Sequence, residues 1–476
     1  MSIDGPPRIL EFPVGGRKPA FRTGSEVELA QTLVAELRQQ HGQLVHSEGR
    51  FYAWRNSHFD EITDPELHVR VQAYDGAGTG SVEHPRPLKL SSRQIKGVIE
   101  ESRAIATSPR FFDDAASGIN CASGLIRLES NGDWSVERHH PDHRLRNILK
   151  ASFNGHVSAR PPSGSLLCTL LDGCFRDDPE AAAKIAIVGE LAGAAAAGLV
   201  WSLKNPKAVI LMGETAENGK SQILELLKGL LPSDAATSIT PAQMANDQFR
   251  AQLAGKLLNI SDELGAAAIS SDVFKAVVTG DPVMGKIVYM APFSFRPRAL
   301  HVFATNRLPS FAEGMDRGVR RRLSVLTFER TIPMAERIVD IGRRIAEREI
   351  DVLLSFAVAG AQRLLQQGAF TETESGRQAL ARWIMITDPV QAFVQDDDVV
   401  QITGEYSDQI RSGAAYQNFR KWCEAEGIPS SRLPTHPQFT GRVNEMALPG
   451  LSVRRRGTTG SIIHGIKLRR VAIIDR

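Results

Sequence analysis

The pattern of apolar and polar positions changes character twice along the chain. Amphipathic helical patterns at residues 24–40 and 91–105 are mixed with short aromatic and β-branched runs such as residues 51–54. Apolar residues that recur every three or four positions predict helices, and short β-branched runs predict strands. We therefore expect a mixed α+β accessory domain over residues 24–203, preceded by a flexible tail rich in Pro and Gly at residues 1–23.

Between residues 204 and 372 the pattern is that of an α/β domain. Bare apolar runs alternate with helical patterns, and the runs cover residues 208–212, 257–260, 299–305 and 323–328. Apolar runs of this length, separated by helices, are typical of a parallel sheet that is buried on both faces. Helical periodicity then dominates from residue 333 to residue 367.

The C-terminal part, which we place at residues 373–476, has a third pattern. A polar stretch at residues 395–413 is interpreted as a separator before a small C-terminal unit. In that unit two helices are predicted at residues 414–426 and 438–447, and a hairpin is predicted at residues 451–470. Two helices followed by a basic hairpin are typical of a winged-helix DNA-binding domain. We therefore expect a small winged-helix-like domain at this end.

Basic residues gather in that hairpin. From residue 450 onward the sequence has seven basic residues and one acid, Asp475, which gives a local net charge of +6. A surface of this charge can neutralise DNA phosphates, although a solvated basic hairpin explains the same composition. Under the first interpretation the candidate DNA contacts are Arg454, Arg455, Arg456 and Lys467.

The overall composition is that of a folded protein with several domains. The chain has 476 residues, 42% of them hydrophobic and 23% charged, and its formal net charge of +3 neither requires nor excludes nucleic acid. Its four cysteines form no C-x-x-C pair, so we expect no zinc module and a reducing, cytoplasmic location. The most apolar helical stretch, residues 185–201, is interrupted by Glu190, so we expect a buried helix and no membrane span.

The clearest chemical motif follows the first central apolar run. Gly213 is followed by Gly219-Lys220-Ser221, where a helical pattern begins. In a phosphate-binding loop, backbone N–H groups surround the phosphates, the lysine contacts the terminal phosphates and the serine hydroxyl binds Mg²⁺. The common motif spaces its glycines about five residues apart, so this loop either has an extra residue or uses Glu214 in the glycine position, and a chance Gly-Lys-Ser is the alternative. We expect ATP and Mg²⁺ to bind at Gly213, Asn218, Gly219, Lys220 and Ser221.

Two further apolar runs end in polar residues. Asp262 and Glu263 follow the second run, and Asn306 follows the third. In P-loop ATPases the first acid holds Mg²⁺ and the second activates the attacking water, while an amide can hold that water near the γ-phosphate. A helix cap for the two acids and a turn for the asparagine are the structural alternatives. The order and spacing of the motifs favour the catalytic interpretation.

A fourth element, Arg320-Arg321-Arg322, precedes the last central run, although three adjacent arginines usually mark a solvated or DNA-facing loop. In this order the motifs resemble those of the superfamily 3 helicases within the AAA+ ATPases, in the phage, plasmid and poxvirus primase-helicase branch. The matching segments are residues 118–124, 218–221, 261–264, 275–295, 303–309, 321–328, 388–390 and 416–423. The resemblance covers most of the chain, and it implies a hexameric ring that moves on single-stranded DNA in the 3′ to 5′ direction.

The resemblance also implies roles for individual residues. Arg321 or Arg322 would reach the nucleotide of the neighbouring subunit and stabilise the charge of the transition state. A β-hairpin at about residues 283–290 would project into the channel of the ring, with Lys286 contacting phosphates and Tyr289 stacking on bases. From the residues alone, an ordinary surface hairpin is the alternative.

We therefore predict an α/β protein with a P-loop AAA+ core, a mixed α+β accessory domain and a winged-helix-like C-terminal domain. Its predicted function is that of a replicative DNA helicase of a phage or other mobile element, acting as a homo-hexamer on single-stranded and forked DNA. One alternative is an origin-binding or loader ATPase that does not unwind, and another is the helicase part of a primase-helicase. The N-terminal region is short for a polymerising domain and has no convincing cluster of metal-binding carboxylates, because the nearest candidate, Asp113-Asp114, lies in a loop-like stretch. Any primase is therefore expected in a separate partner.

Overall fold

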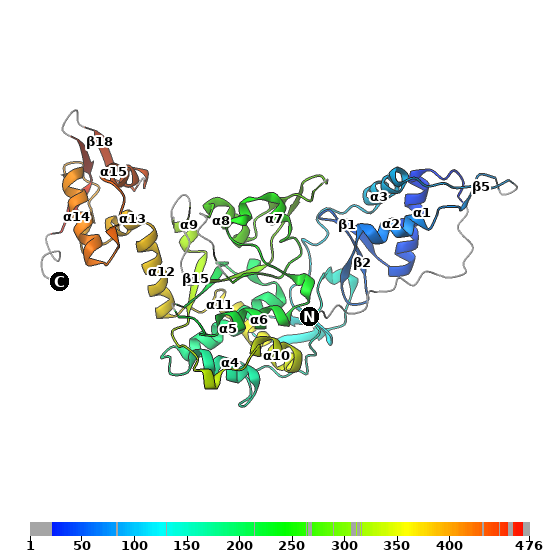
Figure 1. Ribbon diagram of the computed structural model, residues 1–476, viewed down its shortest axis with the longest axis horizontal. Coiled ribbons are helices and arrows are strands. Elements are labelled where there is room, and N and C mark those ends of the chain that lie inside the picture. Colours follow the sequence, from blue (N-terminus) through cyan, green and yellow to red (C-terminus); the bar gives the residue numbers. More distant parts are fainter. Residues whose placement is uncertain are drawn as a thin grey trace.

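The computed structural model describes most of the chain. The described residues are 21–81, 84–129, 131–213, 215–262, 264, 269–288, 290–305, 311, 315, 317–430, 433–446, 448–455 and 460–469, without the side chains of Trp201, Arg317 and Arg455. They form three units along the long axis of the molecule (Figure 1). The central unit carries the parallel sheet, and α12 (Glu374–Thr387) connects it to the C-terminal unit.

The N-terminal unit has a hydrophobic core of its own. Its elements are α1 (Glu26–His41), β1 (Leu44–Ser47), β2 (Arg50–Trp54), β3 (Phe59–Ile62), α2 (Asp64–Gln72), β4 (Gly78–Thr79), β5 (Arg86–Pro87) and α3 (Ser92–Ala106). Helix α1 begins at the N-cap Ser25 and buries one apolar stripe, which includes Leu29, Leu33 and Leu37. Phe21, within the predicted tail, is also buried in this core, so the ordered unit begins earlier than residue 24.

Residues 119–203 pack against the central sheet instead of the N-terminal core. Their elements are β6 (Ile119–Cys121), β7 (Gly124–Leu128), β8 (Trp134–Glu137), α4 (Leu166–Phe175) and α5 (Ala181–Ala197). Ile126 of β7, Leu171 of α4 and Leu191 of α5 all lie in the same cluster as the strands of the sheet. The region that we predicted as one accessory domain therefore contributes to two separate cores.

The central sheet contains β9 (Ala208–Met212), β10 (Ala236–Thr237), β11 (Leu258–Ser261), β14 (Leu300–Thr305) and β15 (Leu323–Thr327). Their order is β10-β11-β14-β9-β15, and every neighbouring pair is parallel. Four of these strands lie at the four predicted apolar runs, and the short edge strand β10 was not predicted. The protein is thus a mixed α/β protein with a five-stranded parallel sheet.

Both faces of the sheet are buried, as its continuous apolar runs predict. Along β9, Val209 and Leu211 face a cluster that includes α5 and α6 (Lys220–Leu230), whereas Ala208 and Ile210 face a cluster that includes α8 (Ser271–Thr279). Successive side chains of a strand point to opposite faces, so an uninterrupted apolar strand buries both. Figure 1 shows the helices on either side of the sheet. Because both faces are covered, a ligand can reach the sheet only at the ends of its strands.

Helices α5 and α11 (Ile350–Gln367) cross at very close range through glycines. A Cβ atom on Gly360 would lie 1.9 Å from the carbonyl oxygen of Gly189, and one on Gly193 would lie 2.4 Å from that of Ala357. The Ala- and Gly-rich stretch is therefore a buried packing helix. In the part of the chain that the structure describes, no helix has the length and apolar character needed to cross a membrane.

The remaining central elements are α7 (Asp247–Ala251), β12 (Val283–Gly285), β13 (Phe293–Phe295), α9 (Arg317–Arg320) and α10 (Ile341–Arg348). Helix α12 also belongs to the packing of this unit, because Ala379 and Trp383 lie in the cluster on the second face of the sheet. The C-terminal core starts later, at Val390. Its elements are α13 (Pro389–Val394), β16 (Val400–Ile402), β17 (Gln409–Arg411), α14 (Ser412–Ala425), α15 (His436–Glu445), β18 (Ser452–Arg455), β19 (Ser461–His464) and β20 (Ile466–Leu468).

Candidate nucleotide site and DNA-facing surfaces

A loop of residues 213–219 joins the carboxyl end of β9 to α6, which begins at Lys220. Gly219 stands before the helix with φ 92°, a left-handed conformation that suits glycine. A Cβ atom there would also lie 2.3 Å from the Sγ atom of Cys174 on α4. The strand, loop and helix that a phosphate-binding loop requires are therefore present, and the glycine has a steric reason.

Lys220 lies beneath this loop and is only 8% exposed. Its Nζ donates to the carbonyl oxygen of Gly213 at 3.1 Å and to Oδ1 of Asn218 at 3.2 Å. Burial lowers the pKa of this ammonium group, and the nearby carboxylate of Asp262 opposes that shift. Both acceptors are uncharged oxygens, so these two bonds hold the ammonium group in place without neutralising its positive charge, which could then attract anionic phosphates.

A cleft of about 570 Å³ opens at the carboxyl edge of the sheet. Because the carboxyl ends of parallel strands share one edge, residues from three strands meet there. The lining residues are Ala216, Glu217, Asn218, Gly219, Lys220, Ser221, Gln222, Asp262, Leu264 and Thr305. The structure thus brings four of the five predicted loop residues together with Asp262, and it adds Thr305 at the end of β14. Gly213 does not line the cleft, and its carbonyl accepts the bond from Lys220.

The oxygen atoms in this cleft fit a magnesium ion. The hydroxyl of Ser221 donates to Oδ1 of Asp262 at 3.3 Å, and both side chains are exposed to the cleft. Hydroxyl and carboxylate oxygens are ligands that Mg²⁺ prefers, together with phosphate oxygens and water. Glu263 and Asn306, which were predicted to act on the attacking water, lie outside the described residues.

The predicted arginines lie at the opposite side of the sheet, where the strands have their amino ends. Leu323, the first residue of β15, pairs with Ala208, the first residue of β9, and the amide of Ala208 donates to the carbonyl of Arg322 at 2.8 Å. Since a strand rises about 3.3 Å per residue, β9 separates this edge from the cleft by roughly 16 Å. Within one chain, Arg321 and Arg322 are therefore not brought to the nucleotide cleft.

The two arginines also differ in their surroundings. The Nε atom of Arg322 donates to Oγ1 of Thr279 at 2.7 Å, and its NH1 donates to the carbonyl of Gly318 at 2.9 Å. Arg321 is exposed. Arg322 thus fastens α8 to the start of β15, whereas the Arg321 guanidinium is accessible to another molecule.

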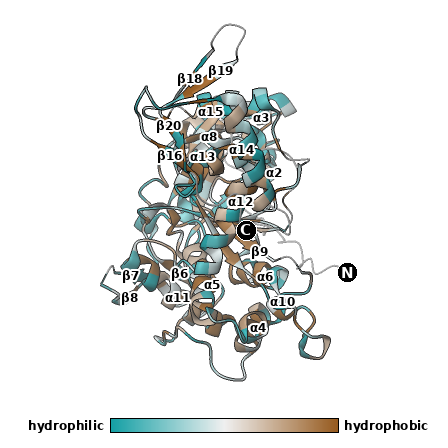
Figure 2. Cartoon of the chain, turned by 90° about the vertical axis from the view of Figure 1, so that its left-hand side faces the viewer, coloured by the Kyte–Doolittle hydropathy of each residue, from teal (hydrophilic) through white to brown (hydrophobic). Residues whose placement is uncertain are grey.

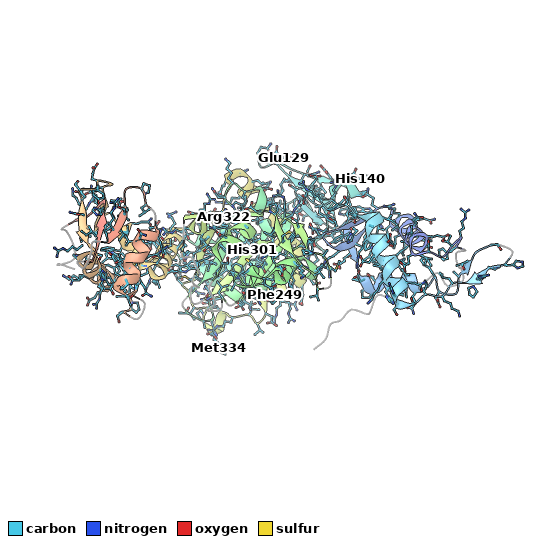
Figure 3. All side chains as sticks on the ribbon, turned by 90° about the horizontal axis from the view of Figure 1, so that it is seen from above. Glu129, His140, Phe249, His301, Arg322 and Met334 are labelled. Atoms are coloured by element: carbon cyan, nitrogen blue, oxygen red, sulfur yellow. The ribbon has the colours of Figure 1, made fainter. Side chains whose placement is uncertain are left out.

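The predicted hairpin is formed by β12 and β13, which pair antiparallel. Lys286 follows β12 and is exposed, and its backbone N–H donates to the carbonyl of Asp247 at 3.2 Å. Phe249 of α7, 40% exposed, lies on the helix that this bond attaches to the hairpin, and Figure 3 shows it on the central unit. Phe249 was not predicted as a candidate DNA contact, because α7 has five residues, too few to give a helical pattern in the sequence. Tyr289 lies outside the described residues.

In the C-terminal unit, α14 and α15 pack beside a three-stranded sheet of order β17-β19-β18. The β18–β19 hairpin stands at the edge of the molecule in Figure 2. Arg454 of β18 is exposed and its guanidinium carbon lies 5.2 Å from the ring centroid of Tyr406, which stacks on His464 at 4.1 Å. Tyr406 was missed because it belongs to the polar stretch that we read as a separator; β16 and β17 place this stretch within the C-terminal sheets.

The other predicted DNA contacts in this unit have different surroundings. Lys467 forms an ion pair of 2.9 Å with Asp408, and its hydrogen bond lowers the pKa of that carboxyl group. Its ammonium group is therefore already engaged by a carboxylate, although the side chain is exposed, as that of Arg454 is. Arg456 lies outside the described residues, and only the backbone of Arg455 is described.

The loop of residues 213–219 is also held by contacts from the segment after β15, which were not predicted. Glu217 accepts a hydrogen bond at its carbonyl from the amide of Ile332, and its carboxylate forms an ion pair of 2.5 Å with Arg337. The hydroxyl of Thr331 donates to that of Thr215 at 3.0 Å. The segment after β15 thus holds the loop in place. No local pattern could indicate these contacts, because the partners lie more than a hundred residues apart in the chain.

Comparison with known proteins gives limited similarity. A family model, described as a family of unknown function (DUF5906), matches residues 211–322, less than a quarter of the chain. No curated protein matches. An A form apo structure of the NrS-1 C-terminal region is 14% identical, with a TM-score of 0.46, and the match covers 93% of this chain and 100% of that one.

A second A form apo structure of NrS-1, of residues 305–718, is also 14% identical and has a TM-score of 0.41, covering 79% of this chain and 81% of that one. A further apo structure of the same region has the same identity and TM-score and covers 93% and 99%. The names of these proteins mention no helicase or ATPase, so the resemblance to the superfamily 3 helicases stays a prediction.

Proposed function

We propose that the protein is an ATP-dependent DNA helicase that acts in replication. The observation that carries the proposal is the cleft in which Lys220, Ser221 and Asp262 meet at the carboxyl edge of a parallel sheet. In this proposal the backbone N–H groups of Gly219 and Ser221 and the ammonium group of Lys220 bind the phosphates of ATP. Ser221 and Asp262 would hold Mg²⁺, which supplies charge neutralisation at the phosphates when bound.

The hydrolytic step follows from the same site. Glu263, directly after Asp262, would accept a proton from the attacking water, and Asn306, directly after Thr305, would orient that water. Thr305 lines the cleft at the end of β14. Its position supports the role of the next residue, because the chain leaves the strand at this edge of the sheet.

The arginines support a shared site between subunits. Arg321 is exposed at the amino edge of the sheet, about the length of β9 from the cleft of its own chain. It would therefore act on the nucleotide of a neighbouring copy, in a head-to-tail arrangement that closes into a ring. Arg321, and not Arg322, is therefore the group that we propose to stabilise the transition state, in agreement with the proposed homo-hexamer.

Two surfaces support DNA as the partner. Lys286 and Phe249 are both exposed and belong to elements that a backbone hydrogen bond joins, and a cation and an aromatic ring are the groups that bind single strands in other proteins. The C-terminal unit combines helices α14 and α15 with the hairpin that carries Arg454, an arrangement that suits a winged helix. We propose that the first surface grips the translocating strand and the second contacts DNA at a fork, with any primase in a separate partner.

The experiment that tests this proposal measures displacement of a strand from a forked DNA with a 3′ tail, in the presence of ATP and Mg²⁺. Wild type should separate the strands, and Lys220→Ala should not. Lys228→Ala is the matched control, because Lys228 is an exposed lysine later on the same helix. A fork with a 5′ tail tests the polarity.

The results separate the proposed function from its main alternative. If wild type hydrolyses ATP and binds DNA but displaces no strand from either fork, an origin-binding or loader ATPase becomes the better description. If Lys220→Ala unwinds as well as wild type, the nucleotide site itself is wrongly assigned.

A further inference from the structure

The N-terminal unit carries a cluster of exposed cations for which the proposed ATPase and DNA surfaces have no role. Between residues 84 and 99 the sequence has four Lys and Arg residues and no Asp or Glu. All four are exposed, and we call them the N-terminal basic patch: Arg86, Lys89, Arg93 and Lys96. They come from β5, the turn after it and the first turns of α3.

The fold holds these side chains outward on a rigid support. Leu88, between Arg86 and Lys89, is buried in the N-terminal core, and its amide donates to the carbonyl of Ala77 at 2.7 Å. Ile95, between the two helical cations, is buried in the same core. The apolar residues thus point inward and the cations outward, so the patch is part of the ordered surface.

Other cations of this unit have carboxylate partners. Arg103 contacts Asp64 at 2.7 Å and Arg50 contacts Glu61 at 2.5 Å. Among the residues that the structure describes, no carboxylate lies within ion-pair distance of the four patch residues. Two acids lie nearby: Glu26 approaches α3 at Gly97, next to Lys96, and Asp75 accepts a hydrogen bond from the amide of Leu90, next to Lys89. Four cations beside these two acids leave the patch with an excess of positive charge.

The position of the cations on α3 is also unfavourable for the isolated helix. The first turns of α1 and α2 contain acids, which is the favourable arrangement at the positive end of a helix dipole. The first turn of α3 contains no acid and carries Arg93 instead, and Lys96 follows in the next turn. The dipole of α3 therefore does not favour these two cations, so they are not explained by the stability of the helix.

We propose that the N-terminal basic patch is a second, sequence-independent binding site for the phosphate backbone of DNA. No large hydrophobic side chain is exposed between residues 84 and 99, so the patch offers phosphate contacts without a stacking surface for bases. Figure 1 shows β5 at the end of the long axis opposite to β18. DNA contacts at both ends of the chain would keep a fork aligned with the central unit. The inference rests on the proposed function, because it assumes that DNA is the partner.

The test compares dissociation constants of the full chain for a 30-nucleotide single strand and a 30-base-pair duplex of unrelated sequence, over a series of salt concentrations. The variant replaces all four residues: Arg86→Ser, Lys89→Ser, Arg93→Ser and Lys96→Ser. Each lost phosphate contact should reduce the slope of log K against log salt by about 0.7 for single strands and about 0.9 for duplex. Four contacts therefore predict a reduction of roughly 3, on whichever DNA the patch binds.

Two controls isolate the patch. A variant that keeps the charges, Arg86→Lys, Lys89→Arg, Arg93→Lys and Lys96→Arg, should bind like wild type. A variant that removes four exposed cations elsewhere, Lys204→Ser, Lys228→Ser, Arg343→Ser and Arg348→Ser, should keep the wild-type slope. The patch variant should melt no earlier than wild type, because it removes cations from the positive end of α3.

The outcomes are distinguishable from those of the proposed function. If wild type binds DNA and the patch variant keeps its slope on both DNAs, the patch is not a DNA site and the helicase proposal stands. If the cations removed elsewhere reduce the slope equally, the effect is one of net charge and the patch proposal fails. If wild type binds neither DNA at any salt concentration, the proposed function itself is wrong.

Discussion

At the scale of single residues, His301 has an unusual position. It lies on β14 with its side chain completely buried, near the centre of the central unit in Figure 3, and its Nδ1 is 3.2 Å from the side-chain nitrogen of Asn259. Burial lowers the pKa of its imidazole to about 4. The unfolded chain therefore binds a proton at higher pH than the folded chain does, and protonation favours unfolding.

This gives a prediction for the dependence of stability on pH. The contribution of His301 is fully present above pH 6.5, the ordinary pKa in the unfolded chain, and is lost as the pH falls through 6.5 towards about 4. A shift of this size corresponds to a loss of roughly 3 kcal/mol. Melting temperatures of wild type and His301→Gln, measured between pH 7.5 and pH 4.5, check it.

The melting temperatures of the two proteins should converge as the pH falls, because wild type loses the contribution of His301 and Gln does not titrate. His41 also has its pKa lowered to about 4, so both proteins share that background. A constant difference between wild type and variant over the whole range would show that His301 does not titrate in this window.

The strand, loop and helix of the candidate nucleotide site could be predicted because the motif is contiguous in the chain, whereas nucleotide binding by these residues stays a prediction. Asn218, Lys220 and Ser221 lie next to one another, and a strand and a helix flank them in the sequence as in the structure. Arg337, which holds the loop through Glu217, could not be predicted, because this contact depends on the path of the chain after β15. The sequence also could not distinguish Arg321 from Arg322. The distinction depends on the hydrogen bond between Arg322 and Thr279, which forms only in the folded structure.

At the scale of elements, the strands that are buried on both faces were the easiest to predict. Strands β9, β11, β14 and β15 are mainly apolar and buried along almost their whole length, which is the pattern of strands covered on both faces. Strand β16, with two exposed residues of three, and β17, in which none is buried, give no such signal, and they were read as a polar separator. A strand at the surface takes its partners from the tertiary structure, so its own sequence contains little of that information.

The crossing of α5 and α11 gives the second prediction. Gly360→Ala places a methyl group against the backbone of Gly189, where a Cβ atom would lie 1.9 Å from the carbonyl oxygen. Both helices must move apart, so we expect a loss of stability of about 3 kcal/mol or more, at the upper end of the cost of overpacking. Urea unfolding of the variant and wild type measures the difference.

Gly441→Ala is the matched control for that substitution. Gly441 also lies inside a helix, α15, but a Cβ atom there would meet nothing within 4 Å. Alanine should therefore stabilise the C-terminal unit slightly, by about 0.5–1 kcal/mol, through helix propensity alone. Equal effects of the two substitutions would mean that the close crossing does not determine the stability of the central unit.

At the scale of the whole molecule, the two edges of the sheet have complementary chemistry. One edge presents the cleft with Lys220 and Ser221, and the other presents Arg321. A single chain cannot bring them together, because the strands of the sheet lie between them. In the proposed ring, two copies placed head to tail would do so, and each copy would contribute one half of a site.

Mixed assemblies test this arrangement. Lys220→Ala lacks a functional cleft and Arg321→Ala lacks a functional arginine, so each alone should hydrolyse little ATP. In a random equal mixture, an intact cleft meets an intact arginine at about a quarter of the interfaces, and up to about that fraction of the wild-type rate should return. Arg322→Ala should instead lower the thermal stability of each chain, because it removes the hydrogen bond to Thr279. If the ATPase rate stays at the level of the separate variants at every mixing ratio, Arg321 does not complete the site of a neighbouring subunit.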